Sequence, residues 1–254
     1  MLRMSGHSKW STIKRQKGIN DSRRGQAFTK IGNLITTAVK SGGGADDPEK
    51  NFKLRLAIEK ARALNMPKSN IERAIERASG QKGGADWTES IFEGYGPLGI
   101  AVIVETATDN KNRTTAEVKN IFERGGGSVT SPGAVSFQFK QVGLITIKKT
   151  DDPEKQILNL MDVGVDDVEE ATDVIEVYVV PESLREIRDK IEKEGFIVLN
   201  EELIMKPLNE VKIEEENKAQ QILKFMGNLE DHDDVQKVYS NFDIPEEILK
   251  KISV

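Results

Sequence analysis

Between residues 142 and 204 the hydrophobic pattern alternates between the period of a strand and the period of a helix. Alternating or continuous short apolar runs predict strands, and apolar residues three or four apart predict helices. The order is strand, helix, strand, strand, helix, strand, which is that of a ferredoxin-like unit. The predicted segments are residues 142–148, 153–163, 168–171, 174–180, 182–194 and 196–204. Because all six elements of this order occur in one continuous segment, we expect the segment to form a separate domain of an α+β protein.

The first third of the chain predicts helices. One should cover residues 21–40, and a second should open at Asp47 and Pro48, a capping residue followed by the residue favoured at the first helical position. A third follows the capping-box pattern of residues 69–72 and stops at Gly80. The predicted apolar stripes are Phe28, Ile31, Leu34, Ile35 and Ala38; Phe52, Leu56 and Leu64 with Leu54, Ile58 and Ala61; and Ile71, Ile75 and Ala78.

A second α/β region surrounds the ferredoxin-like unit in the sequence. Strands are expected at residues 89–95, 98–106 and 128–139, a helix at 110–124, and a further strand, helix and strand between residues 210 and 239. We therefore expect a helical N-terminal domain followed by two ferredoxin-like α/β domains, the third inserted in the second. The predicted domains are residues 1–82, residues 83–139 with 206–254, and residues 140–205, with a hinge at the Gly-rich residues 81–86.

Charge is sorted along the chain, although the net charge is only −5. Residues 1–82 hold 18 Lys and Arg against 7 Asp and Glu, which gives +11. Residues 83–150 are balanced, and residues 151–254 hold 12 against 28, which gives −16. Salt screens charges over about 8 Å, so each end presents its own field. The positive end suits a polyanion, and the acidic end repels a polyanion or faces a basic protein surface.

The basic segment gives the clearest candidate binding site. Its cations can meet phosphates, and Trp10 offers a ring on which a base or sugar can stack. The predicted nucleic-acid contacts in this segment are Lys9, Trp10, Lys14, Arg15, Lys17, Arg23, Arg24 and Lys30. Lys111 and Arg113 form a second candidate anion site, where a strand feeds a helix with free N–H groups. The competing interpretation is that Thr108 or Asp109 simply caps that helix.

Other chemistry finds little support in the sequence. There is no Cys, and the two His residues, His7 and His232, have no metal-ligand spacing and are expected to be solvated or capping. Residues 231–234 (DHDD) lack the Gly and the spaced Glu of a calcium loop. No metal or cofactor is expected. There is also no run of 18 apolar residues to span a bilayer and no secretory signal pattern, so we predict a cytoplasmic protein without a membrane partner.

Three separated stretches resemble the YebC family. They read MSGHSKWSTIKRQKGINDSRRGQAFTKI, EGYGPLGIAVIVETATDNKNRT and GGSVTSPGAVSFQF. The family usually starts with MAGHSKW, so Met4 matches its first residue. The resemblance implies three domains and no established enzyme activity, and it places the matching basic residues at the same positions, including Lys111 and Arg113. Bacterial members are described as DNA-binding transcriptional regulators, whereas the mitochondrial branch activates the translation of cytochrome c oxidase.

The sequence thus predicts a non-enzymatic, nucleic-acid-binding regulator of gene expression. A DNA-binding transcriptional regulator is favoured, and a ribosome-associated factor that binds ribosomal RNA is the alternative, since phosphate contacts barely separate the two. A Mg²⁺-dependent enzyme that uses clustered acids is a third, less favoured, hypothesis. Because no homodimer interface is evident, a monomer is favoured.

Overall fold

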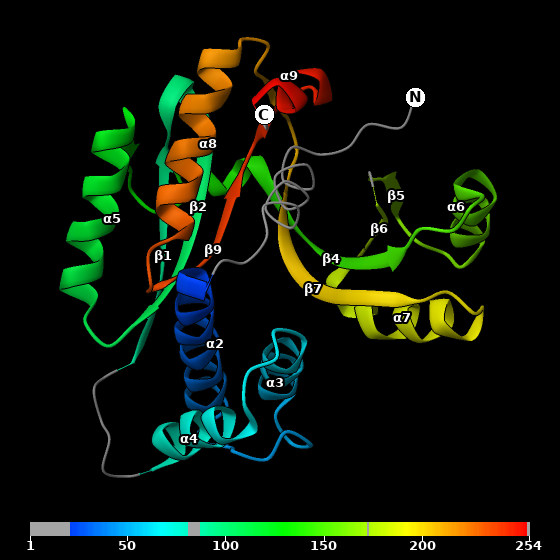
Figure 1. The fold of residues 1–254 in the computed structure, drawn as a ribbon, viewed down its shortest axis with the longest axis horizontal. Helices are drawn as coiled ribbons and strands as arrows, with labels where there is room; N and C mark the ends of the chain where they lie inside the picture. Colours follow the sequence, from blue (N-terminus) through cyan, green and yellow to red (C-terminus); the bar gives the residue numbers. More distant parts are fainter. Residues whose placement is uncertain (1–20, 81–86, 172, 253–254) are drawn as a thin grey trace. The chain divides into compact units, whose positions relative to one another are not determined.

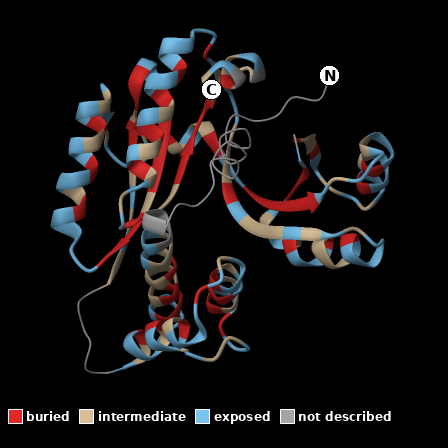
Figure 2. Ribbon diagram, viewed as in Figure 1, coloured by how far each residue is buried: buried red, intermediate tan, exposed pale blue. Residues whose placement is uncertain are grey.

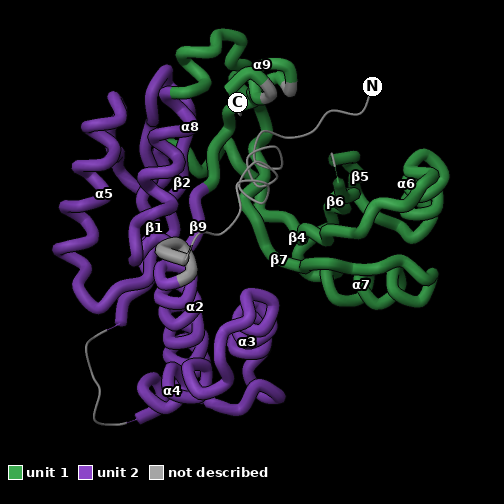
Figure 3. Tube along the Cα trace, viewed as in Figure 1, with its two compact units in different colours: residues 1–18, 135–220, 239–254 green, residues 19–134, 221–238 purple. Residues whose placement is uncertain are grey.

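The computed structural model describes residues 21–80, 87–171 and 173–252. It divides into two compact units, shown in Figure 3. Among described residues, unit 2 comprises residues up to 134 together with 221–238, and unit 1 comprises residues 135–220 with 239–252. The predicted hinge at residues 81–86 lies outside the described residues. The boundaries of the three predicted domains are not tested by this division and stay a prediction.

Unit 2 begins with helices that share one apolar core (Figures 1 and 2). They are α2 (Asp21–Ser41), α3 (Phe52–Ala63) and α4 (Lys68–Ser79). The centre of this core includes Ile35, Leu54 and Ala61, which are fully buried. The helical N-terminal region predicted from the sequence is therefore confirmed. No helix in the described ranges is both long enough and apolar enough to cross a membrane.

Two predicted helix starts are wrong. The chain at Asp47 and Pro48 forms a turn, and α3 begins later, because the Asn51 side chain accepts a hydrogen bond from the Leu54 N–H at 3.0 Å. The Asn51 amide also donates to the carbonyl oxygens of Ala38 (2.8 Å) and Ala45 (3.0 Å), which fixes it as the cap. The expected capping box at residues 69–72 is likewise absent, since α4 starts after Pro67 with no side-chain cap.

The second part of unit 2 is a sheet with strand order β3-β1-β2-β9. Its elements are β1 (Thr88–Tyr95), β2 (Ala101–Thr108), α5 (Lys111–Gly125), β3 (Ser128–Val129), α8 (Glu216–Glu230) and β9 (Val235–Ser240), with a 3-10 turn at Pro97–Gly99. The start of α8 and the end of β9 fall within the bounds of unit 1. The rings of Phe122 on α5 and Phe225 on α8 meet edge to face at 5.2 Å, so both helices cover the same face of the sheet (Figure 1).

The long strand predicted at residues 128–139 is also wrong. Up to residue 138 only β3 forms there, because Gly133 turns the chain with a positive φ of 88° and its N–H donates to the Glu93 carboxylate at 2.8 Å. A 3-10 turn at Ser136–Gln138 follows before the next strand.

Unit 1 is built around the predicted ferredoxin-like pattern. It contains β4 (Phe139–Lys148), α6 (Pro153–Asp162), β5 (Asp167–Glu170), β6 (Val174–Val179), a 3-10 turn (Pro181–Ser183), α7 (Leu184–Lys193) and β7 (Val198–Pro207). The strand order is β5-β6-β4-β7, and every neighbouring pair is antiparallel. This order and pairing confirm the α+β fold class and the ferredoxin-like unit.

A small two-stranded sheet completes unit 1. The strand β8 (Val211–Lys212) pairs in parallel with β10 (Phe242–Asp243), and α9 (Glu246–Ile252) follows. The sequence pattern had placed the first of these strands in one strand-helix-strand unit with residues 235–239. Its pairing with β10, which the pattern did not predict, corrects that assignment.

We predict opposite effects of adding a methyl group at two glycines of unit 2. A Cβ on Gly94 in β1 would lie 2.5 Å from the Ser128 carbonyl oxygen and 2.7 Å from the Phe122 ring. Gly94→Ala should therefore lower the free energy of unfolding by about 1–3 kcal/mol. A Cβ on Gly32 in α2 meets nothing within 4 Å, so Gly32→Ala should raise it by about 0.5–1 kcal/mol. Urea unfolding followed by circular dichroism measures both, and equal effects would contradict this account.

Candidate functional site

The carboxylate of Asp234, buried in the turn between α8 and β9, is the centre of a group of polar contacts in unit 2. Its Oδ2 atom accepts hydrogen bonds from the Thr114 hydroxyl (2.6 Å), the Arg113 guanidinium (2.8 Å) and the Thr108 hydroxyl (3.1 Å). Burial opposes ionisation, but these three donors outweigh it and keep the pKa of Asp234 below its ordinary value. One ionised carboxylate thus ties the end of β2 and the first turn of α5 to the turn before β9.

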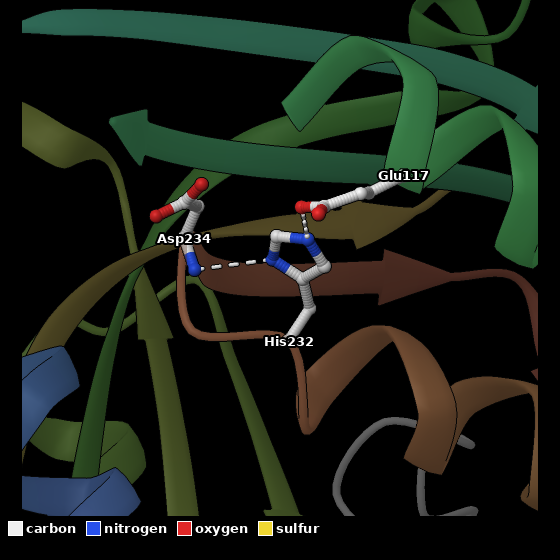
Figure 4. Close-up of side chains that lie close together, drawn as sticks. All are labelled: Glu117, His232 and Asp234. Atoms are coloured by element: carbon white, nitrogen blue, oxygen red, sulfur yellow. Dashed lines mark hydrogen bonds and ion pairs between the residues drawn. The ribbon is translucent and has the colours of Figure 1, made fainter. Parts of the chain in front are cut away.

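His232 extends this cluster to Glu117 on α5, as Figure 4 shows. The backbone N–H of Asp234 donates to Nδ1 of His232 at 3.1 Å, and Nε2 of His232 lies 2.8 Å from the Glu117 carboxylate. Because Nδ1 accepts from an amide, the ring proton belongs on Nε2, where it donates to Glu117. His232 therefore accepts a hydrogen bond from a backbone amide and donates one to a carboxylate.

Possible ligand atoms of Glu117, His232 and Asp234 lie within 4.8 Å of one another, which makes this cluster a candidate metal site. Ligation through Nε2 would require a proton on Nδ1, which faces the N–H of Asp234. The Arg113 guanidinium also stands 2.8 Å from the Asp234 carboxylate, where a cation would need to bind. The geometry fits a hydrogen-bonded cluster and not a metal centre.

The helix α2 is held against this same turn. The Lys30 ammonium donates to the carbonyl oxygens of Glu230 and Val235, the latter at 2.9 Å, and the Asn33 amide donates to the Asp233 carbonyl at 3.3 Å. Lys30 was expected to contact nucleic acid. Its ammonium is instead directed to backbone carbonyls of residues 230–235.

A pocket of about 550 Å³ lies beside the cluster, lined by side chains of α2, α5 and residues 231–234. Arg113 on its wall is already within ion-pair distance of Asp234, Asp109 and Glu117. The hydrogen bond and charge of Asp234 raise the pKa of Arg113, so the guanidinium stays charged. With its one arginine among several carboxylates, this pocket does not suit a phosphate.

At the helix start, residues 108–114, backbone N–H groups are hydrogen-bonded by side chains of the same segment. The Asn110 side chain caps α5 by accepting from the Arg113 N–H at 3.1 Å, and Thr108 accepts from the Asn110 N–H at 2.9 Å. The cap is therefore Asn110, not Thr108 or Asp109. Lys111 is exposed on the first turn of α5, whereas the Arg113 side chain is committed to carboxylates.

The remaining predicted contacts are only partly described. Lys9, Trp10, Lys14, Arg15 and Lys17 lie outside the described residues. Arg23 and Arg24 fall in the first turn of α2. Binding of nucleic acid by this set stays a prediction, and the described members Lys30, Lys111 and Arg113 do not form one free cationic surface.

The helices α3 and α4 carry exposed cations that were not among the predicted contacts. They are Lys53, Arg62, Lys68, Arg73 and Arg77. Their signal was present in the sequence, because the buried stripe of α4 (Ile71, Ala74 and Ala78) leaves the opposite face to solvent.

A helical N-terminal part followed by two four-stranded sheets with their helices defines the class of this α+β protein. The chain belongs to the TACO1/YebC family: the model of its N-terminal domain matches residues 8–81, and that of its second and third domain matches residues 87–242. The resemblance noted in the sequence is thereby confirmed.

Similar proteins cover nearly the whole chain. A relative from Syntrophomonas wolfei is 45% identical over 97% of this chain and 99% of its own, and one from Chloroflexus aurantiacus is 48% identical over 98% and 99%. Both are named "Probable transcriptional regulatory protein". The crystal structure of a conserved hypothetical protein from Aquifex aeolicus is 40% identical, with a TM-score of 0.81 over 90% of this chain and 94% of that one.

We predict that Asp234→Asn destabilises the chain in a pH-dependent way. Loss of the charge weakens three hydrogen bonds, which should cost about 1–3 kcal/mol at pH 7. Because folding lowers the pKa of Asp234, its contribution is complete above its unfolded pKa of about 4 and is lost as the pH falls through the folded value. Urea unfolding of both proteins between pH 7 and pH 2 should show a stability gap that closes in acid.

The neighbouring Asp233→Asn is the matched control, since the Asp233 side chain is exposed and its recorded contact with Asn33 uses the backbone carbonyl. It should unfold like the wild type at every pH. A gap of the same size for both variants would show that the buried hydrogen bonds of Asp234 are not its cause.

Proposed function

We propose that this chain is a non-enzymatic regulator of gene expression that acts in the cytoplasm by binding nucleic acid, with DNA as the favoured target. The observation that supports the proposal is the set of exposed cations on α3 and α4, within a segment of net charge +11. The names of the bacterial relatives support a regulatory role.

The exposed cations of α3 and α4 would attract nucleic acid through electrostatic interaction with its phosphates. Cations that meet phosphates release condensed counterions, which drives binding without reading the base sequence. The acidic residues 151–254 repel the same polyanion, so they favour approaches in which the basic helices make the contact.

The cluster around Asp234 supports a binding role over a catalytic one. A general base needs a free acceptor, yet both ring nitrogens of His232 and the Oδ2 atom of Asp234 are engaged in hydrogen bonds. These hydrogen bonds stabilise the turn before β9.

Ribosomal RNA is the second candidate target. Four residues join α3 to α4, which is a length found in helix-turn-helix motifs, but the two helices pack mainly against α2 and not against each other. Without that packing, α3 and α4 lack the helix-turn-helix arrangement that places a recognition helix in the major groove of DNA. This observation keeps a ribosome-associated role as the alternative.

We predict that Arg62, Arg73 and Arg77, all changed to Gln, weaken nucleic-acid binding. Losing up to three phosphate contacts should lower the slope of log affinity against log salt by about 2–3 on duplex DNA. Titration of a labelled duplex at several salt concentrations measures this slope. The same titration on a chain lacking residues 1–24 measures the share of the basic arm.

The control variant changes Lys155, Arg185 and Lys193, which are exposed cations of the acidic region, to Gln. It removes the same charge and should leave the salt slope unchanged. If both triple variants weaken binding equally, net charge and not the α3–α4 surface drives attachment.

We predict that the chain separates from ribosomes when cell extract is sedimented through a gradient at moderate salt, as expected for a promoter-binding protein. Footprinting of a promoter at physiological salt is the companion measurement. Migration with ribosomal particles, without any footprint, would instead support the ribosomal RNA alternative.

A further inference from the structure

Phe52 lies in an unexpected place for an apolar aromatic residue. The sequence pattern assigned it to the buried stripe of α3, but 44% of its surface is exposed. It is the first residue of α3, directly after the Asn51 cap, whose amide is fixed to the carbonyls of Ala38 and Ala45. The cap therefore holds the start of the helix, and with it the Phe52 backbone, in a defined position.

Cationic side chains surround this residue in the chain. The Arg55 guanidinium lies over the Phe52 ring, with its central carbon 5.9 Å from the ring centroid. The Nε atom of Arg55 is buried and has no hydrogen-bond partner within the described part of the chain. Lys53 is exposed beside Phe52, and the Lys50 ammonium is also exposed, 3.6 Å from Asp47.

An exposed ring beside an arginine has the features that proteins use to bind unpaired bases. Bases stack on aromatic rings and on guanidinium planes, while nearby cations neutralise the phosphates. Each stacked base is worth roughly five- to a hundredfold in affinity. The carboxylate of Asp47 on the same loop is already engaged by Lys50 and by the Glu49 N–H, which limits its repulsion of a phosphate.

We propose that Phe52 and Arg55 form a stacking site for an unpaired nucleobase, with Lys53 at the adjacent phosphate. The site rests on the proposed nucleic-acid-binding function and deepens it. In a regular duplex each base is covered by its neighbours, so its face cannot reach the Phe52 ring. The site therefore selects single strands, loops or opened duplexes over intact double helix.

The test compares single strands with duplexes. Fluorescence anisotropy measures the affinity of the full chain for labelled oligonucleotides of about 12 nucleotides, a length within the range of single-strand sites. Four probes of one mixed sequence are used: single-stranded DNA, single-stranded RNA and the two matching duplexes. Phe52→Leu keeps an apolar side chain without a ring, and Phe52→Trp keeps a ring.

Phe52→Leu should weaken single-strand binding about tenfold, with an unchanged salt slope because no charge is lost. Phe52→Trp should bind single strands as the wild type does, and neither variant should change duplex affinity. Phe137, exposed by 69% in unit 1, supplies the matched control, and Phe137→Leu should have no effect. The single strand that the wild type binds with the higher affinity shows whether the stacked base comes from DNA or from RNA.

Wild-type affinity of Phe52→Leu for both single strands would overturn the stacking site, as would an equal loss on single strands and duplexes. Failure of the wild type to bind any of the four probes would overturn the proposed function itself. The two failures are therefore distinguishable.

Discussion

A single buried carboxylate organises unit 2. Asp234 can stay ionised in its turn only because Thr108, Arg113 and Thr114 supply the hydrogen bonds that water would otherwise give. Meeting this requirement joins β2 and α5 to the turn before β9. The carbonyl groups of that turn then receive the ammonium of Lys30 from α2. Since α3 and α4 pack on α2, the placement of the exposed basic helices depends on the same buried charge.

Helix starts show which features of the fold the sequence alone can predict. An Asp-Pro pair at residues 152–153 opens α6 as the local rule predicts, with the Asp152 side chain accepting from the Lys155 N–H. The same pair at residues 47–48 forms only a turn, because Asn51 is anchored by carbonyl groups as distant as Ala38 and becomes the cap. Local chemistry is identical in the two places, and the tertiary partner decides between them. Long apolar periods, by contrast, depend on many residues at once, so the ferredoxin-like order could be predicted.

The candidate site could be predicted less well than the fold, because its contacts join distant parts of the chain. Charge counting identified Lys30 and Arg113 as cations, but their partners lie 205 and 121 residues away. Residues 231–234 look like a solvated acidic loop in the sequence, and only the fold buries one of them, Asp234. The spacing of apolar residues cannot reveal such polar contacts, because a single charged residue forms no repeating pattern in the sequence. Phe52 was misplaced for a different reason, because two residues along a helix turn the side chain by about 200°, which puts Phe52 opposite the buried Leu54.

These pairings change the meaning of the sorted charge. The value of +11 counts every cation of residues 1–82, yet an ammonium directed at backbone carbonyls, as in Lys30, is not free to release counterions from a phosphate. Arg113 is similarly neutralised by the carboxylates around it. The effective positive surface is smaller than the formal charge, and α3 and α4 contribute exposed cations to it. A surface of few charges gives modest affinity and no discrimination between sequences. The proposed stacking on Phe52 differs from counterion release because it depends on whether a base is paired.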